Sequence, residues 1–185
     1  AKENDLICVT GDLGAAYAGL LLLEREKKVF EVNPNMQPDF EGYDYLLERQ
    51  LKPEPRYEII KDLKKYNIEP TAMTLVSNGL AAAILHICRA SQKGCQLIEA
   101  KLPIDIVTFQ ALKNFNIVAT TAALNGGDDY ELLFTIRPSD IEKIEPLKKD
   151  VSIVGYIKEK NAGYHLITND DKQLPLTSQE FSPIE

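Results

Sequence analysis

Two adjacent acidic residues, Asp128 and Asp129, follow two glycines in the stretch NGGDDYELLF, which runs from Asn125 to Phe134. Glycine allows left-handed and crowded backbone conformations, and the apolar residues that come next are typical of a buried strand. Carboxylates held at such a turn could bind a ligand or a cation. A plain surface turn that leads into a core strand explains the same residues, so the rest of the chain must decide between the two interpretations.

Two further turns combine glycine with polar residues. The first, from Gly11 to Gly14, lies between a short strand and a long stretch of helix formers, where free backbone amides can bind phosphate. It lacks both the full G-x-G-x-x-G fingerprint and the lysine of a phosphate-binding loop, which favours a structural turn. The second, Ser77-Asn78-Gly79, also leads from a strand into a helix, and Ser77 or Asn78 can cap that helix.

The elements around these turns are predicted from hydrophobic periodicity. Strands are expected at Asp5 to Thr10, Thr71 to Val76, Cys95 to Ala100, Tyr130 to Ile136, Val151 to Ile157 and Tyr164 to Thr168. Helices are expected at Leu13 to Phe30, Tyr43 to Leu51, Arg56 to Tyr66, from about Leu80, at Asp105 to Phe115 and after Pro138. Mixed strands and helices in this order favour an α+β or layered α/β sheet with helices on its faces.

The composition is that of a globular chain of 185 residues, long enough to bury a real core. The excess of 28 acidic over 21 basic residues gives a net charge of −7, which argues against a nucleic-acid partner. The sequence contains neither a membrane-spanning stretch nor a secretory signal, so a cytoplasmic location is expected. Three cysteines without a C-x-x-C pair suit reduced, mostly buried thiols, and two histidines argue against a zinc site.

The motifs, in their order, resemble those of thiamine-monophosphate kinases, which belong to the aminoimidazole-ribonucleotide-synthetase superfamily. The matching segments are VTGDLGAAYAGL, KPEPR, MTLVSNGL, LPI, NGGDDYELLF and VGYI. The resemblance covers nearly the whole chain, but only the C-terminal domain of the family and the end of the linker into it. It implies an α+β fold, with three α/β/α layers around a mixed four-stranded sheet, as in the superfamily's C-terminal domain.

The resemblance also implies a division of the chain and an activity. Residues 1–52 would form an inter-domain strand, helix and connector, and residues 53–185 the C-terminal α/β domain. The family's N-terminal domain, which binds ATP and Mg²⁺, would lie outside the chain. The full-length family transfers a phosphoryl group from ATP to thiamine monophosphate, gives thiamine diphosphate, and forms homodimers. As a phosphotransferase fragment, the chain alone is not expected to turn over.

Site residues carry over from the family motif position by position. Ser77 stands at a nucleotide-binding position and Asp128 at a substrate-binding carboxylate, where the family usually has the longer glutamate. Phe181 stands where the family places a tryptophan against the substrate rings. Leu75 and Asn78 occupy the positions of two metal-binding aspartates, so no metal ligand is assigned.

This departure leaves two alternatives to an ordinary kinase domain. The chain could be a degenerate, non-catalytic module for binding or oligomerisation, because leucine cannot ligate a cation and asparagine offers only a neutral oxygen. It could also belong to a superfamily synthetase with another substrate, which likeness of fold alone cannot separate.

Overall fold

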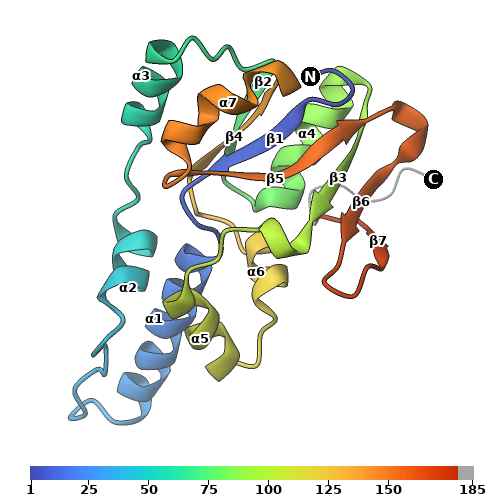
Figure 1. Cartoon of the computed structure of the whole chain (residues 1–185). Coiled ribbons are helices and arrows are strands. Elements are labelled where there is room, and N and C mark those ends of the chain that lie inside the picture. Colours follow the sequence, from blue (N-terminus) through green and yellow to red (C-terminus); the bar gives the residue numbers. More distant parts are fainter. Residues whose placement is uncertain (179–185) are drawn as a thin grey trace.

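A mixed β-sheet runs through the computed structural model, which describes residues 1–178 (Figure 1). Within these residues the sheet has seven strands, in the order β2-β4-β1-β5-β3-β6-β7, and only β3 and β6 pair in parallel. The strands are β1 (Leu6–Thr10), β2 (Ala72–Val76), β3 (Gly94–Ile98), β4 (Glu131–Ile136), β5 (Val151–Lys158), β6 (Tyr164–Ile167) and β7 (Gln173–Pro175).

The α+β class is therefore confirmed, whereas the expected number of four strands in the sheet is wrong. The four expected strands correspond to β2, β3, β4 and β5. The sheet is larger because β1 inserts between β4 and β5, and because β6 and β7 extend it beyond β3. The strand that was assigned to the linker segment 1–52 is thus a central strand of the sheet. The division at residues 52 and 53 itself stays a prediction.

Helices cover both faces of the sheet and form a separate group beside it (Figure 1). The α-helices are α1 (Ala15–Val32), α2 (Asp44–Leu51), α3 (Tyr57–Lys65), α4 (Leu80–Ser91), α5 (Ile106–Asn114), α6 (Ala119–Asn125) and α7 (Ile141–Ile144). Short 3₁₀ turns lie at η1 (Glu99–Lys101), η2 (Pro138–Asp140), η3 (Glu145–Leu147) and η4 (Lys160–Ala162).

Each group of helices has its own apolar cluster. On one face, Leu80 and Ile84 of α4 pack against strand residues such as Leu133. On the other face, Ile59 of α3 lies in a cluster with Phe134. The third cluster holds α1, α2, α5 and α6 together and contains Leu22, Leu46, Leu112 and Ala122. Apolar faces at helical spacing drive this packing, as the sequence pattern predicts.

The strand register brings three chain segments to one end of the sheet. Because β2 and β4 are antiparallel, Val76 at the end of β2 lies opposite Glu131 at the start of β4. Because β1 and β4 are also antiparallel, the end of β1 reaches the same edge, with Val9 opposite Leu133. The loops that follow β1 and β2 therefore lie beside the turn that precedes β4. Ser77 and Asp128, two of the site residues predicted from the sequence, belong to these segments.

The prediction that Ser77 or Asn78 caps the following helix is wrong. The N-cap residue of α4 is Gly79, and no side chain accepts a hydrogen bond there. Gly79 has a φ of 88°, and a Cβ at this position would lie 2.3 Å from the carbonyl oxygen of Leu124. Close approach of α6 therefore requires glycine at the start of α4 and leaves Asn78 outside the helix.

Candidate functional site

A polar pocket of about 240 Å³ lies where the β2–α4 loop meets the turn before β4. The backbone N–H of Asp128 donates to the carbonyl oxygen of Ser77 at 2.7 Å, which fixes the two segments side by side. The structure thus brings together Ser77 and Asp128, two of the predicted site residues. The residues that line the pocket are Ser77, Asn78, Asn125, Gly126, Gly127, Asp128 and Ser178.

Leu75 does not share this pocket, although Asn78 does. Its side chain is 45% exposed and lines a second, mainly apolar pocket of about 320 Å³. Tyr130, two residues beyond Asp128, lines this apolar pocket as well. The turn therefore presents Asp128 to one pocket and Tyr130 to the other. Phe181, the third predicted site residue, lies outside the described residues.

Asp129 is directed into the protein and is only 1% exposed. Its carboxylate accepts hydrogen bonds from the backbone N–H groups of Gly14, at 2.9 Å, and of Ala16, at 3.4 Å. Burial raises the pKa of Asp129 to about 7, against the smaller opposing effects of these hydrogen bonds and of Arg49. The amides at the start of α1 that could have bound a phosphate are therefore used by a carboxylate of the chain itself, in keeping with a structural turn.

Glu131 is completely buried, and three side chains bind its carboxylate. Arg56 binds both oxygens, with its Nε 2.7 Å from Oε2, while Arg49 lies 2.9 Å from Oε1. The Thr10 hydroxyl donates to Oε2 at 2.5 Å. Gly11 makes room for this arrangement, since a Cβ there would lie 2.2 Å from Oε1. A buried carboxylate with two guanidinium partners is a structural ion cluster. It joins β1, α2 and β4 to the proline connector, the segment KPEPR at residues 52–56 between α2 and α3.

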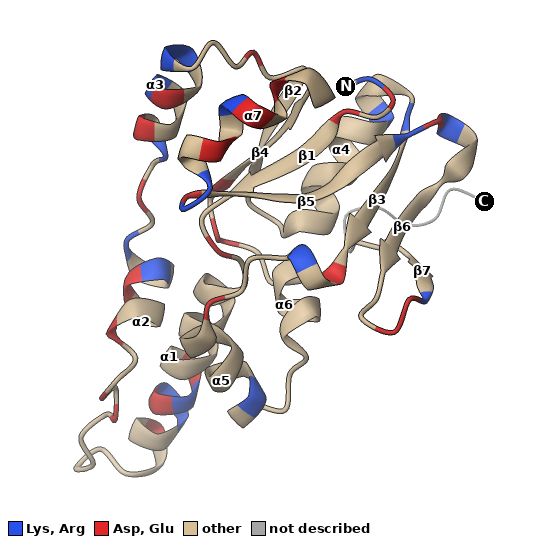
Figure 2. Ribbon diagram, in the orientation of Figure 1, with Lys and Arg blue, Asp and Glu red and all other residues tan. Residues whose placement is uncertain are grey.

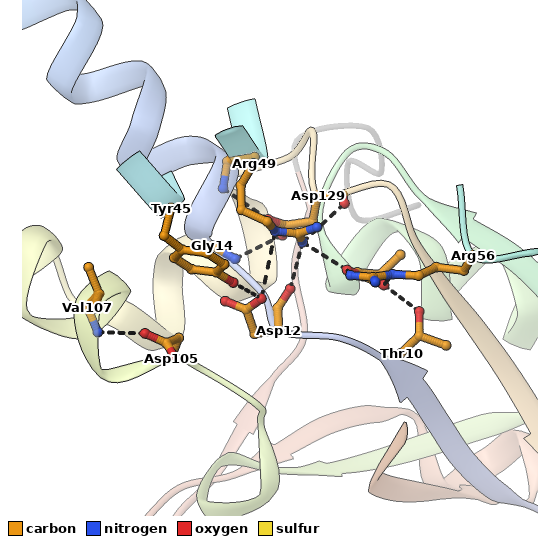
Figure 3. Close-up of polar contacts among 11 residues, drawn as sticks. Thr10, Asp12, Gly14, Tyr45, Arg49, Arg56, Asp105, Val107 and Asp129 are labelled. Atoms are coloured by element: carbon orange, nitrogen blue, oxygen red, sulfur yellow. Dashed lines mark hydrogen bonds and ion pairs between the residues drawn. The ribbon is translucent and has the colours of Figure 1, made fainter. Parts of the chain in front are cut away.

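Asp12 extends the cluster toward α2. The hydroxyl of Tyr45 donates to its Oδ1, and the Nε of Arg49 lies 3.7 Å from the same oxygen (Figure 3). Burial raises the pKa of Asp12 despite these contacts, and burial is also the main cause that raises the pKa of Tyr45. Oδ2 of Asp12 is buried without a hydrogen-bond partner among residues 1–178.

Sequence reasoning missed this ion cluster. It interpreted KPEPR only as a connector, and it assigned no role to Arg49 or Asp12. Two signals were present: an arginine directly after the proline connector, and acidic residues at the starts of two turns. Neither signal names its partner, because the partners lie 75 positions apart for Arg56 and Glu131 and 80 positions apart for Arg49 and Asp129.

The described residues contain no cluster of three or more His, Cys, Asp and Glu side chains that could hold a metal ion. Lys and Arg alternate with Asp and Glu along α1, α2 and α3 (Figure 2). No helix in residues 1–178 is both long and apolar enough to cross a membrane.

Known proteins similar to this chain were found by sequence. No family model matches it. The thiamine-monophosphate kinase of Buchnera aphidicola from Acyrthosiphon pisum is 37% identical over 176 residues, which are 93% of this chain and 50% of that protein. The enzyme of the same name from Bacillus subtilis is 30% identical over 187 residues, which are 98% of this chain and 53% of that protein. Over most of its length, the chain is therefore similar to about half of a thiamine-monophosphate kinase.

A solved structure of the family has the same fold. The structure described as AaThiL complexed with AMPPCP and TMP has a TM-score of 0.74 and 28% identity, and the match covers 94% of this chain and 50% of that chain. The chain thus spans about half the length of the family members it matches. The resemblance to the family's C-terminal domain is confirmed, and the activity of a whole kinase is a separate question.

Proposed function

We propose that this chain forms the substrate-side surface of a thiamine-monophosphate kinase. In that reaction an oxygen of the thiamine monophosphate phosphate attacks the γ-phosphorus of ATP, a new P–O bond forms, and the bond to the β–γ bridging oxygen breaks to release ADP. Sequence similarity to thiamine-monophosphate kinases over most of this chain supports the proposal, as does the similar structure of AaThiL, which was solved with AMPPCP and TMP. Phosphoryl transfer of this kind depends on positioning and on charge neutralisation rather than on a covalent nucleophile.

The pocket of Ser77 and Asp128 is the observation that carries this proposal. Thiamine monophosphate combines a cationic thiazolium ring with an anionic phosphate. The half-buried carboxylate of Asp128 can attract the cation, while the Ser77 hydroxyl and the amide of Asn78 offer hydrogen bonds in the same pocket. The chain would thus hold and orient the acceptor and would contact the nucleotide through Ser77, whereas the other residues that bind ATP would come from elsewhere in the protein.

The side chains of this pocket do not make a magnesium site by themselves. Mg²⁺ is usually held by one or two carboxylates together with substrate phosphates and water, and Asp128 is the one carboxylate among the described residues that line the pocket. Leu75 cannot donate and faces the apolar pocket, and Asn78 offers only a neutral carbonyl. We therefore derive no step of the reaction through a metal held by these residues, and we expect this chain alone to show no ATP-dependent turnover.

The proposal is tested by measuring thiamine monophosphate binding to the chain by titration calorimetry. Asp128→Asn removes the carboxylate and should weaken binding by about tenfold, the usual scale for a contact with a charged partner. Asp171→Asn is a matched control, because Asp171 has the same left-handed backbone, with φ of 58° against 60°, and lies outside the pocket. If the two variants bind equally well, Asp128 is not the substrate carboxylate, and a wild-type chain that does not bind would overturn the proposal.

A degenerate binding or oligomerisation module is the second candidate, and the identities of Leu75 and Asn78 favour it. This candidate predicts that the chain does not bind thiamine monophosphate and that mass measurements show a stable dimer. In the full-length protein, it also predicts that Leu75→Asp with Asn78→Asp raises kinase activity. A native full-length enzyme that is already as active as the double variant would exclude it.

A further inference from the structure

The turn that carries Asp128 has an unusual backbone. Gly127, Asp128 and Tyr130 all have positive φ, at 80°, 60° and 53°. Glycine adopts this conformation freely, but an aspartate rarely does and a bulky tyrosine hardly ever does. Such a backbone persists only where the surrounding contacts hold it, and it sets the directions in which Asp128 and Tyr130 enter their two pockets.

Two backbone hydrogen bonds hold the turn on the side of the β2–α4 loop. The N–H of Asp128 donates to Ser77, and the N–H of Tyr130 donates to the carbonyl oxygen of Val76 at 2.9 Å. On the other side, the Asp129 carboxylate is bound at the start of α1. These contacts fix the ends of the turn, but they leave the carbonyl oxygen of Asp129 to be bound from another element.

Arg49, on α2, supplies that contact (Figure 3). One terminal nitrogen of its guanidinium donates to the carbonyl oxygen of Asp129 at 3.3 Å and to that of Asp12 at 3.1 Å, and it lies 2.9 Å from Oε1 of Glu131. The side chain of Arg49 is only 10% exposed. A single buried guanidinium thus joins the Asp128 turn to the loop after β1 and to the start of β4.

We infer that Arg49 is a positioning residue that sets the orientation of Asp128 in the substrate pocket. This inference rests on the proposed function in one respect, since it takes Asp128 as the substrate contact. Arg49 itself lies outside the lining of the Ser77 and Asp128 pocket and acts on it through the backbone of the turn. Lysine does not replace it, because its side chain ends one bond short of the terminal guanidinium nitrogen that makes all three contacts.

The first test uses the chain itself and does not depend on the substrate. Arg49→Lys keeps the charge opposite Glu131, so the protein is expected to fold, and amide NMR spectra should show shifts concentrated at residues 126–131. Arg137→Lys, at an exposed arginine whose nearest acidic partner is Glu69 at 4.0 Å, is the control and should leave this turn unchanged. Unchanged resonances at 126–131 in Arg49→Lys would overturn the inference.

The second test is a double-mutant cycle for thiamine monophosphate binding. Arg49→Lys alone should weaken binding by about tenfold, but it should have little further effect in Asp128→Asn, because both changes remove the same contact. Additive losses, or lost binding with an unchanged turn, would mean that Arg49 acts on the ligand directly and would overturn the positioning role. If the wild-type chain does not bind, the proposed function fails, and the NMR result still decides whether Arg49 sets the turn.

Discussion

The two adjacent aspartates of one turn have opposite surroundings. Asp128 is half-buried at an open polar pocket beside Ser77, whereas Asp129 is buried and binds the amides that start α1. Glu131, two residues further on, is buried with two arginines. Residue type alone therefore does not show which carboxylate is open to a ligand and which is used within the protein. The difference lies in whether the protein itself already supplies the partners of the carboxylate.

Glu131→Gln should show the largest effect on the buried side of this comparison. It removes the charge that Arg49 and Arg56 share, and breaking a buried pair by removing one partner costs about 3 to 5 kcal/mol of unfolding free energy. Urea unfolding followed by circular dichroism measures the loss. Glu58→Gln is the control, because Glu58 pairs with Lys61 on the exposed surface, and it should change stability by less than about 0.5 kcal/mol. If Glu131→Gln and Glu58→Gln lose the same unfolding free energy, burial does not strengthen the ion pairs of Glu131.

Gly11→Ala should have the next largest effect, because it places a methyl group against Glu131 and Arg56. Gly11 has a φ of 58°, so alanine is strained there, and the cluster has to shift as well. Gly42→Ala separates the two costs, since Gly42 has a φ of 78° and open space around it. We expect a loss of about 1 kcal/mol at Gly42 from backbone strain, and about 2 to 3 kcal/mol at Gly11. If Gly11→Ala and Gly42→Ala unfold at similar temperatures, the ion cluster accommodates the added methyl group at little cost.

The pH dependence of stability should report the burial of Asp129. The pKa of Asp129 is raised from an ordinary value of 3.8 to about 7, so the folded state keeps a proton that the unfolded state releases. Unfolding free energy should therefore fall as pH rises from about 4 to 7, by up to about 1.4 kcal/mol per pH unit. Asp129→Asn should flatten this slope in urea titrations at several pH values, and an unchanged slope in this variant would contradict the prediction. Asp12, with a raised pKa of its own, is present in both the wild-type chain and the variant.

The sequence predicted most elements because their signals are local, but it predicted neither α6 nor β7. Hydrophobic periodicity placed β2, β4 and the start of α4 within a residue or two, and glycine turns marked the ends of β1 and β2. The four-stranded sheet was implied by the resemblance, and the order of the strands carries no local signal that could have corrected it. The α4 cap was predicted wrongly because close contact with α6 selects Gly79 over a capping side chain.

Of the polar residues in this region, the sequence motifs identified only those that line an open pocket. Ser77 and Asp128 line one pocket, and their roles toward a ligand stay predictions. The roles of Arg49, Arg56 and Glu131 depend on pairing between segments far apart in the chain. An arginine that binds a buried carboxylate looks, in sequence, like any arginine on a solvated helix face. The structural role of such an arginine is recognised only when the burial of its side chain and its distances to partner atoms are known.

The smallest expected effect concerns magnesium at the open pocket. Asn78→Asp adds a second carboxylate to the pocket of Asp128, and two anionic oxygens should raise the weak affinity for Mg²⁺ by about threefold to tenfold. Leu75→Asp adds the same charge, but beside Tyr130 in the apolar pocket, and should leave the affinity unchanged. Titrating Mg²⁺ while following the amide resonance of Asp128 measures both. A similar gain in the two variants would show that the pockets act as one site, and that the turn does not separate them.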